Sequence, residues 1–258
     1  MSVHFGGRGP GHMSRSMGGL NPLSLFAGGL KGVWYDPSDL ATVWQDSGRT
    51  TPGVVGQPVG CIDDKSGNGY NAIQATAGSR PILRNSGTLY WLEFDGVDDF
   101  LASNATVDLT ASNEVSAFIG LRKTSDATTQ VVLENTTAAG SFRVYVPTGL
   151  TNYIYGAGGT TSIDVNATGL AAPNTAVISG QTKISTPIST IRVNGVQRAT
   201  TGTPLGTGNM GNYTLYLGRR NGTTLPFAGN VYGVIVVGSL VASPTATETW
   251  LNGKTGAY

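Results

Sequence analysis

The chain contains 258 residues, including 38 Gly and 12 Pro, and its formal net charge at pH 7 is +1. Charged residues make up 12% of it, against about 25% in ordinary soluble domains. This balance gives no electrostatic signature of nucleic-acid or anionic-membrane binding, so we expect neither partner. The length suits one all-β domain, because sandwiches and barrels often reach about 200–250 residues as single domains.

Targeting and redox signals are few. Residues 1–30 lack the apolar region of a secretory signal peptide, and no apolar run approaches the ~20 residues of a membrane-spanning helix. We therefore expect folding in the cytosol and no membrane insertion. Cys61 is the single cysteine, so no internal disulfide can form, and we expect a small buried residue there.

Residues 1–31 form a separate N-terminal arm. The arm is rich in glycine, has no acidic residue and cannot build an apolar core of its own. It is either a disordered tail or an anchor that becomes ordered against a partner. The residues expected to make the anchoring contacts are Phe5, Arg8, Arg15, Leu20, Leu25 and Phe26. A metal site is a third alternative, although nothing fixes the geometry of its candidate ligands, which are His4, His12, Met13 and Met17.

After the arm, residues 32–35 predict a first strand. Asp36-Pro37 is typical of a helix start, with an N-cap followed by proline at the first helical position. Leu40, Val43 and Trp44 then fall on one face of a short helix.

A possible calcium loop follows at residues 63–69. Asp64, Ser66 and Asn68 match the first half of a calcium-binding loop, and Gly69 follows them. The bidentate glutamate of the twelfth position is absent, because Ala75 stands there. The alternative is a structural turn, since Asn and Asp beside Gly also form turns. Calcium is the cofactor that this loop suggests, and the turn interpretation predicts none.

From residue 71 onward, short apolar segments recur with Gly, Asn or Pro between them, at roughly 10-residue spacing in the later part, which is typical of an antiparallel all-β fold. The predicted strands are residues 71–74, 89–94, 99–103, 115–123, 129–135, 141–147, 152–155, 161–166, 175–185, 188–194, 196–201, 213–219 and 226–237. The most apolar of them, 115–121 and 232–237, are expected to be central. Ser243-Pro244 predicts a last short helix, which Gly253 would end.

The stretch from Trp91 to Leu101 is the most informative part of the chain. Phe94 is followed by Asp95-Gly96-Val97-Asp98-Asp99, and this segment resembles the opening of a concanavalin A-like, laminin-G-type jelly roll. Residues 189–198, 216–219 and 227–236 resemble later strands of that family. Residues 34–40, 63–69 and 248–256 are similar to a subgroup common in tailed-bacteriophage structural proteins. The resemblance covers residues 32–258, which we predict to form one jelly-roll sandwich.

The resemblance implies a structural protein of the virion. The sandwich would be displayed outward, held by residues 1–31 to other virion proteins, and would adhere to a host-surface glycan as a tail-associated module. A head-decoration protein that reinforces the capsid is the alternative. The family resemblance also makes a homo-oligomer the expected state, although no residue pattern here encodes one. The expected location is the virion, assembled in the host cytoplasm.

Glycan hydrolysis is a third hypothesis, because glycosidases occur on this fold. Glu93, Asp95 and Asp98 superficially resemble the Glu-x-Asp-x-x-Glu motif of jelly-roll endoglucanases. The third position is Asp rather than Glu, and the Asp95-Gly96 turn interrupts the strand that would have to project all three carboxylates. No His lies in the predicted sandwich, so no Ser-His-Asp triad can form there. We therefore predict a protein that is not an enzyme.

The best sugar-binding candidates in the sequence are Asn152, Tyr153 and Tyr155. Tyrosines at the edge of a loop could stack on a sugar, and the Asn152 amide could bond its hydroxyl groups. The alternative is that Tyr153 and Tyr155 share one strand face and pack inside the sandwich. The four tryptophans are expected in the core, because large aromatic side chains dominate cores.

Overall fold

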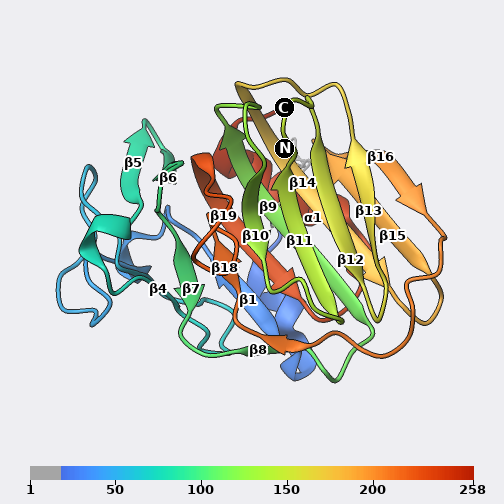
Figure 1. The fold of residues 1–258 in the computed structure, drawn as a ribbon. Helices are drawn as coiled ribbons and strands as arrows, with labels where there is room; N and C mark the ends of the chain where they lie inside the picture. Colours follow the sequence, from blue (N-terminus) through green and yellow to red (C-terminus); the bar gives the residue numbers. More distant parts are fainter. Residues whose placement is uncertain (1–18) are drawn as a thin grey trace, which may run out of the picture.

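Two antiparallel sheets lie face to face across one apolar core (Figure 1). The structure, a computed structural model, describes residues 19–258. Figure 1 shows β10, β11 and β12 of one sheet in front of β9 and β14 of the other. The predicted all-β antiparallel sandwich is confirmed.

The first sheet, called sheet A, has the strand order β16-β15-β14-β9-β19-β6-β5, and β1 also pairs with β19. Its long central strands are β9, β14 and β19, and β9 pairs with both of the others along most of its length. The strands are β1 (Gly32–Tyr35), β5 (Ile82–Ser86), β6 (Leu89–Asp95), β9 (Glu114–Lys123), β14 (Asn174–Lys183), β15 (Ile188–Val193), β16 (Val196–Thr201) and β19 (Ala228–Val237). The expectation that segments 115–121 and 232–237 are central is confirmed.

The second sheet, called sheet B, has the order β13-β12-β11-β10-β18-β7-β4-β3-β2. Its strands are β2 (Val43–Trp44), β3 (Cys61–Ile62), β4 (Ala72–Ile73), β7 (Leu101–Ser103), β10 (Gln130–Glu134), β11 (Ser141–Val146), β12 (Tyr153–Gly158), β13 (Ser162–Ala167) and β18 (Tyr216–Leu217). The Asp95-Gly96 turn carries the chain from β6 in sheet A to β7 in sheet B. Gly96 has a φ of 77°, a conformation that glycine adopts without steric cost.

The core between the sheets is built from aliphatic side chains and a few aromatic rings. Phe94 and Phe227 pack with their ring centroids 6.2 Å apart. Tyr155 fits against Gly180 of β14, where an added Cβ would lie 2.2 Å from the Tyr155 ring. This close approach explains why a strand interior, usually unfavourable for glycine, carries Gly180. Cys61 is fully buried, as expected from the sequence.

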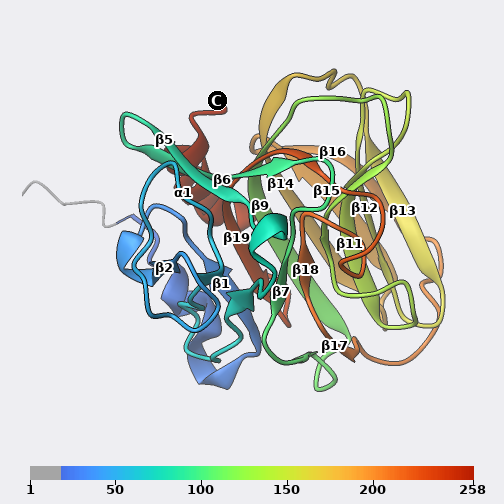
Figure 2. The same cartoon turned by 60° about the vertical axis from the view of Figure 1, so that its left-hand side comes forward.

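The tryptophans lie outside the core between the sheets. Trp34 is buried, as predicted, but in a second cluster, while Trp44, Trp91 and Trp250 are half-buried, so the predicted core position is wrong for these three. Trp34 and Trp250 meet edge to face on the outer side of sheet A, with ring centroids 5.7 Å apart. They border a second apolar cluster on that side, whose buried members are Phe26, Trp34, Phe118, Val177, Ile235, Val237 and Leu251. Two helical elements cover the cluster. They are α1 (Pro244–Thr255), which contacts β9, β14 and β19, and the 3-10 helix η1 (Pro22–Gly29), which contacts β1 and β19 (Figure 2).

Part of the predicted anchoring arm is therefore part of the folded body. Phe26 is only 6% exposed, so its side chain is not available to a neighbouring protein. The anchoring role predicted for Phe26 is wrong, because the outer face of sheet A needs apolar cover. Leu25 is half-buried against the same cluster, and its anchoring role stays a prediction. Leu20 is half-buried. Phe5, Arg8 and Arg15 lie outside the described residues.

The short helices differ from the prediction in detail. Leu40 lies in a 3-10 helix, η2 (Leu40–Thr42), while Val43 and Trp44 form β2, because they pair with Ile62 and Cys61. Helix α1 continues past Gly253 and ends at Thr255, and the φ of 61° at the next residue, Gly256, suits a glycine after the last turn. A third 3-10 helix, η3 (Ala77–Ser79), precedes β5. Among residues 19–258, no helix is long and apolar enough to cross a membrane.

A buried ion pair fixes α1 to sheet A. Glu248 of α1 is 1% exposed and accepts hydrogen bonds from Arg192 of β15 at 2.7 Å and 3.1 Å. The Ser179 hydroxyl of β14 donates to the same carboxylate. Because Arg192 binds the carboxylate through two hydrogen bonds of defined geometry, the pair fixes the position of α1 on sheet A.

Replacing Glu248 with Ala should therefore destabilise the protein by about 3 kcal/mol, because Arg192 and Ser179 would lose their buried partner. Urea unfolding of wild type and variant measures this loss. The matched control is Glu93→Ala, which breaks the exposed Arg84–Glu93 pair and should cost less than about 1 kcal/mol. Equal losses in the two variants would contradict the assigned role of Glu248.

Candidate functional site

The sugar-binding prediction for Tyr153 and Tyr155 is wrong. The alternation of β12 points both rings into the core between the sheets, and both residues are fully buried. The Tyr153 hydroxyl donates to the backbone oxygen of Asn174 at 3.1 Å, and burial raises the pKa of both tyrosines above the ordinary value. Neither ring can stack on a sugar. Asn152 is half-buried before β12, and its carbonyl accepts a bond from Lys123.

The predicted calcium ligands hold the chain together instead. The Asp64 carboxylate accepts from the backbone N–H groups of Trp34 and Tyr70 at 2.9 and 3.0 Å, and also from Ser66. The Asn68 amide donates to the Gly32 carbonyl at 3.1 Å. These bonds use both oxygens of Asp64 and brace the start of β1. The three residues therefore fit the structural turn better than a calcium site.

The carboxylates weighed for hydrolysis are also engaged in the fold. Glu93 pairs with Arg84 at 2.9 Å. Asp95 accepts from the backbone N–H of Val97 at 2.8 Å, and Asp98 accepts from the Ser79 hydroxyl at 2.7 Å. Together with Asp99, which is 6% exposed, Asp95 and Asp98 form an acidic cluster whose oxygens lie within 4.8 Å of one another. The pKa of Asp99 is raised to about 6, mainly by burial; the backbone N–H of Asp95 acts to lower it and the neighbouring carboxylates act to raise it.

A more open group of residues lies at one end of the sandwich. There β8 (Val107–Asp108) pairs with β17 (Asn212–Tyr213), at the bottom of Figure 1 and of Figure 2. The loop 108–113 leads from β8 into β9, and the chain leaves β19 beside it. The Gly238 N–H donates to the Lys31 carbonyl at 2.9 Å, which brings the end of β19 to the residue before β1.

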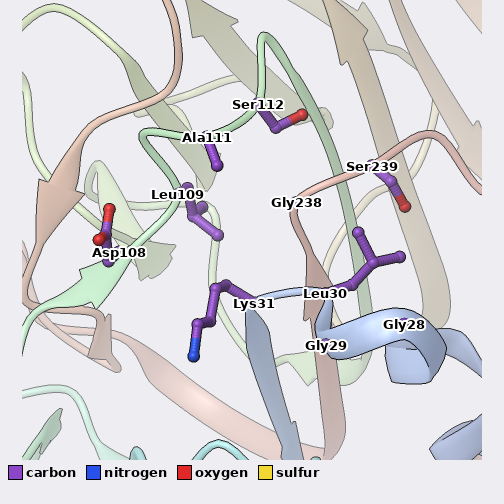
Figure 3. A pocket seen from close by; sticks show the side chains of 10 residues that line it. All are labelled: Gly28, Gly29, Leu30, Lys31, Asp108, Leu109, Ala111, Ser112, Gly238 and Ser239. Atoms are coloured by element: carbon purple, nitrogen blue, oxygen red, sulfur yellow. The ribbon is translucent and has the colours of Figure 1, made fainter.

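Between these segments lies a cavity of about 400 Å³, which we call the Lys31–Asp108 cavity (Figure 3). Its lining residues come from three separate parts of the chain and are Gly28, Gly29, Leu30, Lys31, Asp108, Leu109, Ala111, Ser112, Gly238 and Ser239. Figure 3 shows Asp108 at one side of the cavity and Leu30 and Ser239 at the other. Most of this surface is apolar, and the charged groups are one ammonium and one carboxylate.

Leu109 and Gly238 form the inner wall of the cavity. Leu109 is 2% exposed, and a Cβ added to Gly238 would lie 3.2 Å from the Leu109 side chain. Any larger residue than glycine at position 238 would therefore crowd this wall. The side chains of Leu30 and Ala111 are exposed, so they offer further apolar contact near the opening.

Asp108 is fixed in position and kept ionised. The Thr110 hydroxyl and N–H donate to its Oδ1 at 2.6 and 3.0 Å. These bonds lower the pKa of Asp108, and the charge of Lys31 lowers it further. Among residues 19–258, no donor is bonded to Oδ2 of Asp108 and no carboxylate pairs with Lys31. The Ser112 hydroxyl oxygen accepts from the Glu114 N–H at 3.0 Å, which leaves its proton able to donate.

A second hollow, of about 450 Å³, lies beside Trp250 and is also lined by Leu20 and Gly253. The Lys254 side chain already lies over the Trp250 ring. The Lys254 ammonium sits 4.8 Å from the centre of the Trp250 ring and donates to the Ser38 hydroxyl at 2.6 Å. The ring therefore offers less surface for stacking on a sugar than a bare tryptophan would.

Sequence reasoning missed the Lys31–Asp108 cavity. Lys31, Asp108 and Gly238 are far apart in the chain, and only the pairing of β1 with β19 and the path of β8 bring them together. One local signal was present. Asp108-Leu-Thr110 is a short side-chain-to-backbone turn, a pattern that marks an ordered loop but does not indicate what faces it.

The comparisons with known proteins show the fold. No family model and no curated protein matches the chain. Among solved structures, it is similar to the botulinum neurotoxin serotype G binding domain, with a TM-score of 0.56, 11% identity, and coverage of 74% of this chain and 48% of that one. The binding domain of botulinum neurotoxin DC in complex with SialylT gives 0.54 and 11%, covering 85% and 52%. The chain thus spans about half the length of these structures.

The raised pKa of Asp99 predicts a pH effect on stability. The folded-state pKa of about 6 lies above the ordinary ~3.9, so between about pH 4 and 6 the folded chain keeps a proton that the unfolded chain releases. The free energy of unfolding should therefore fall as pH rises through that window. Asp99→Asn should flatten this fall, which urea unfolding at a series of pH values measures.

The control is Asp46→Asn. Burial acts to raise the pKa of Asp46, but the hydrogen bonds from Thr50 and Thr51 together outweigh it and lower the pKa to about 2, so the folded-state titration lies below the window. This variant should keep the wild-type slope between about pH 5 and 6, because the Asp46 carboxyl is ionised there in both the folded and the unfolded chain. An Asp99→Asn protein with an unchanged slope would show that Asp99 titrates normally.

Proposed function

We propose that the chain is a glycan-binding module carried on a phage virion, and that the Lys31–Asp108 cavity takes a sugar. The observation that carries this proposal is an ionised carboxylate with one unbonded oxygen, beside an unpaired ammonium, over an apolar wall. A concave, mainly apolar site with a few well-placed polar groups is the usual form of a small-ligand site.

The chemistry of a sugar matches this arrangement. One hydroxyl can donate to Asp108 Oδ2 while a neighbouring hydroxyl accepts from the Lys31 ammonium. The C–H face of the ring can then lie against Leu30 and Ala111, whose side chains are exposed. Hydrogen bonds to charged groups are worth about 1.5–3 kcal/mol each, so two of them can orient one sugar unit.

The fold likeness supports a binding role without assigning a ligand. The similar structures are receptor-binding domains, one of them in complex with SialylT and another from a type C toxin that depends on two ganglioside molecules to enter cells. At 9–11% identity this support is an analogy between folds. It favours adhesion over hydrolysis, because these neighbours are binding domains.

The virion role rests on the family resemblance and on the composition of the N-terminal segment. We propose that residues 1–18, rather than the whole of 1–31, contact other virion proteins, since η1 is part of the folded body. Adhesion to host glycans favours a tail-associated place over head decoration. Labelling the N-terminus and finding it on the tail or on the head distinguishes the two.

Asp108→Asn should weaken glycan binding at least about 10-fold, because the amide keeps an oxygen for Thr110 but replaces the free acceptor with a donor. A glycan array identifies the ligands of the wild-type chain, and calorimetry on the strongest of them measures the loss. Glu93→Gln is the matched control and should bind like wild type. Wild-type binding by Asp108→Asn to every array ligand would place the site elsewhere.

Deleting residues 1–18 should leave the unfolding free energy unchanged but remove the protein from particles. Deleting residues 1–31 should also destabilise the fold by about 3 kcal/mol or more, because Phe26 would be lost from the outer cluster. Quantitative immunoblots of purified particles measure incorporation, and urea unfolding measures stability. Normal incorporation of the shorter deletion would refute anchoring through residues 1–18.

A further inference from the structure

We propose that the ligand of the Lys31–Asp108 cavity is a neutral oligosaccharide, one unit of which occupies this cavity while another occupies a second cavity beside it. The inference rests on the proposed glycan-binding function and specifies the ligand. The observation behind it is a second, polar cavity at the same end of the sandwich.

The second cavity has a volume of about 420 Å³ and lies at the same end of the sandwich. It is formed by the β14–β15 turn, the loop before β17 and the last residue before β9. Its lining residues are Asn113, Ile184, Ser185, Pro187, Gly206, Thr207, Gly208 and Asn209. We call it the Asn113 cavity. Its lining contains amide and hydroxyl groups and no charged side chain.

The two cavities have one loop in common, because neighbouring residues of the chain line one cavity each. Ser112 lines the first and Asn113 lines the second, and neighbouring Cα atoms are about 3.8 Å apart. The loop between them is held rigidly. The Asn209 amide donates to the Thr110 carbonyl at 2.7 Å, and the Met210 N–H donates to the Ser112 carbonyl at 2.8 Å. In the proposed complex, a linear chain of sugars crosses this loop, with one unit in each cavity.

The polar groups of the Asn113 cavity suit sugar hydroxyls. The Asn113 side-chain oxygen accepts from Ser185 at 3.0 Å, which orients the amide. Within the described residues, its NH₂ group and the Thr207 hydroxyl are bonded to no protein partner. Pro187, which is exposed, supplies an apolar contact. This chemistry provides donors and acceptors without a charge.

The charges of the two cavities together select a neutral ligand. Lys31 and Asp108 cancel, and the Asn113 cavity adds none. An acidic sugar would bring its carboxylate close to the ionised Asp108, which is unfavourable. A neutral unit uses Asp108 as an acceptor and Lys31 as a donor at the same time.

Occupying both cavities raises affinity without a new kind of contact. Once one unit is bound, the linked unit binds as an intramolecular event, so the gain can reach about 100-fold over the single sugar. The loss of translational freedom is incurred once for the whole oligosaccharide. Affinity should therefore rise steeply when the chain becomes long enough to reach the second cavity and then level off.

The experiment titrates the full chain with glucose, galactose, mannose and N-acetylglucosamine, and with their linear oligomers from disaccharide to hexasaccharide. Saturation-transfer NMR measures the weak sugars, and calorimetry measures the longer ones. The Thr207→Val and Asn113→Asp double variant removes two donors from the second cavity. The Asp retains an oxygen that can accept from Ser185.

The double variant should lose at least about 10-fold in affinity for the oligosaccharide and bind the monosaccharide as wild type does. Thr128→Val is the control, since Thr128 is an exposed threonine in the loop between β9 and β10, at the other end of the sandwich. A second readout is independent of the variants. The amide signals of residues 206–209 should shift with the oligosaccharide and not with the monosaccharide.

The outcomes separate this inference from the proposed function. Affinity that does not change with chain length, or a double variant that binds the oligosaccharide as tightly as wild type, overturns the two-cavity inference alone. A wild-type chain that binds no sugar of the panel, on either readout, overturns the glycan-binding function and this inference with it. Preferential binding of uronic-acid oligomers added to the panel overturns the assignment of a neutral ligand.

Discussion

The architecture depends on covering both faces of sheet A. The central strands β9, β14 and β19 are buried along nearly their whole length, and they present apolar side chains to the core on one side and to the outer cluster on the other. An antiparallel sheet usually leaves one face in water. Here α1 and η1 cover the outer face, and the Glu248–Arg192 pair fixes α1 in one position. The burial of Phe26 and Trp34 follows from this need.

That constraint also decides where a ligand can bind. The space between the sheets is filled by side chains such as Tyr155 and Phe142, and the outer face of sheet A is covered by helices. The two cavities described above therefore lie at the end of the sandwich, where the strands of sheet A pass into loops. The loop 108–113 is held there by Thr110, Asn209 and Met210 through hydrogen bonds, so it is a loop with a fixed shape. Binding residues are often found on loops that a rigid scaffold positions.

Local sequence patterns predicted the long strands and the turns, because these depend mainly on neighbouring residues. Apolar alternation located β6, β9 and β19, and turn chemistry located Asp95-Gly96 and the start of α1. The same alternation could not say which face of β12 points inward, so it left both a sugar site and core packing open for Tyr153 and Tyr155, and the structure shows core packing. Short strands such as β3 and β5 escaped prediction because tertiary pairing, rather than a strong apolar pattern, creates them. The candidate site was not predictable, since Lys31, Asp108 and Gly238 meet only through the sheet topology.

The electrostatics of the Lys31–Asp108 cavity favour binding over hydrolysis. A glycosidase needs two carboxyl groups about 5–9.5 Å apart, one of them with a raised pKa so that it can donate a proton near neutral pH. The lining of this cavity contains one carboxylate, and the Thr110 bonds and Lys31 lower its pKa. Asp108 is therefore a poor proton donor and a strong hydrogen-bond acceptor. Such a group can hold a hydroxyl in place, but it cannot protonate a leaving group, so the same residue that makes the cavity suitable for a sugar makes it unsuitable for cleaving one.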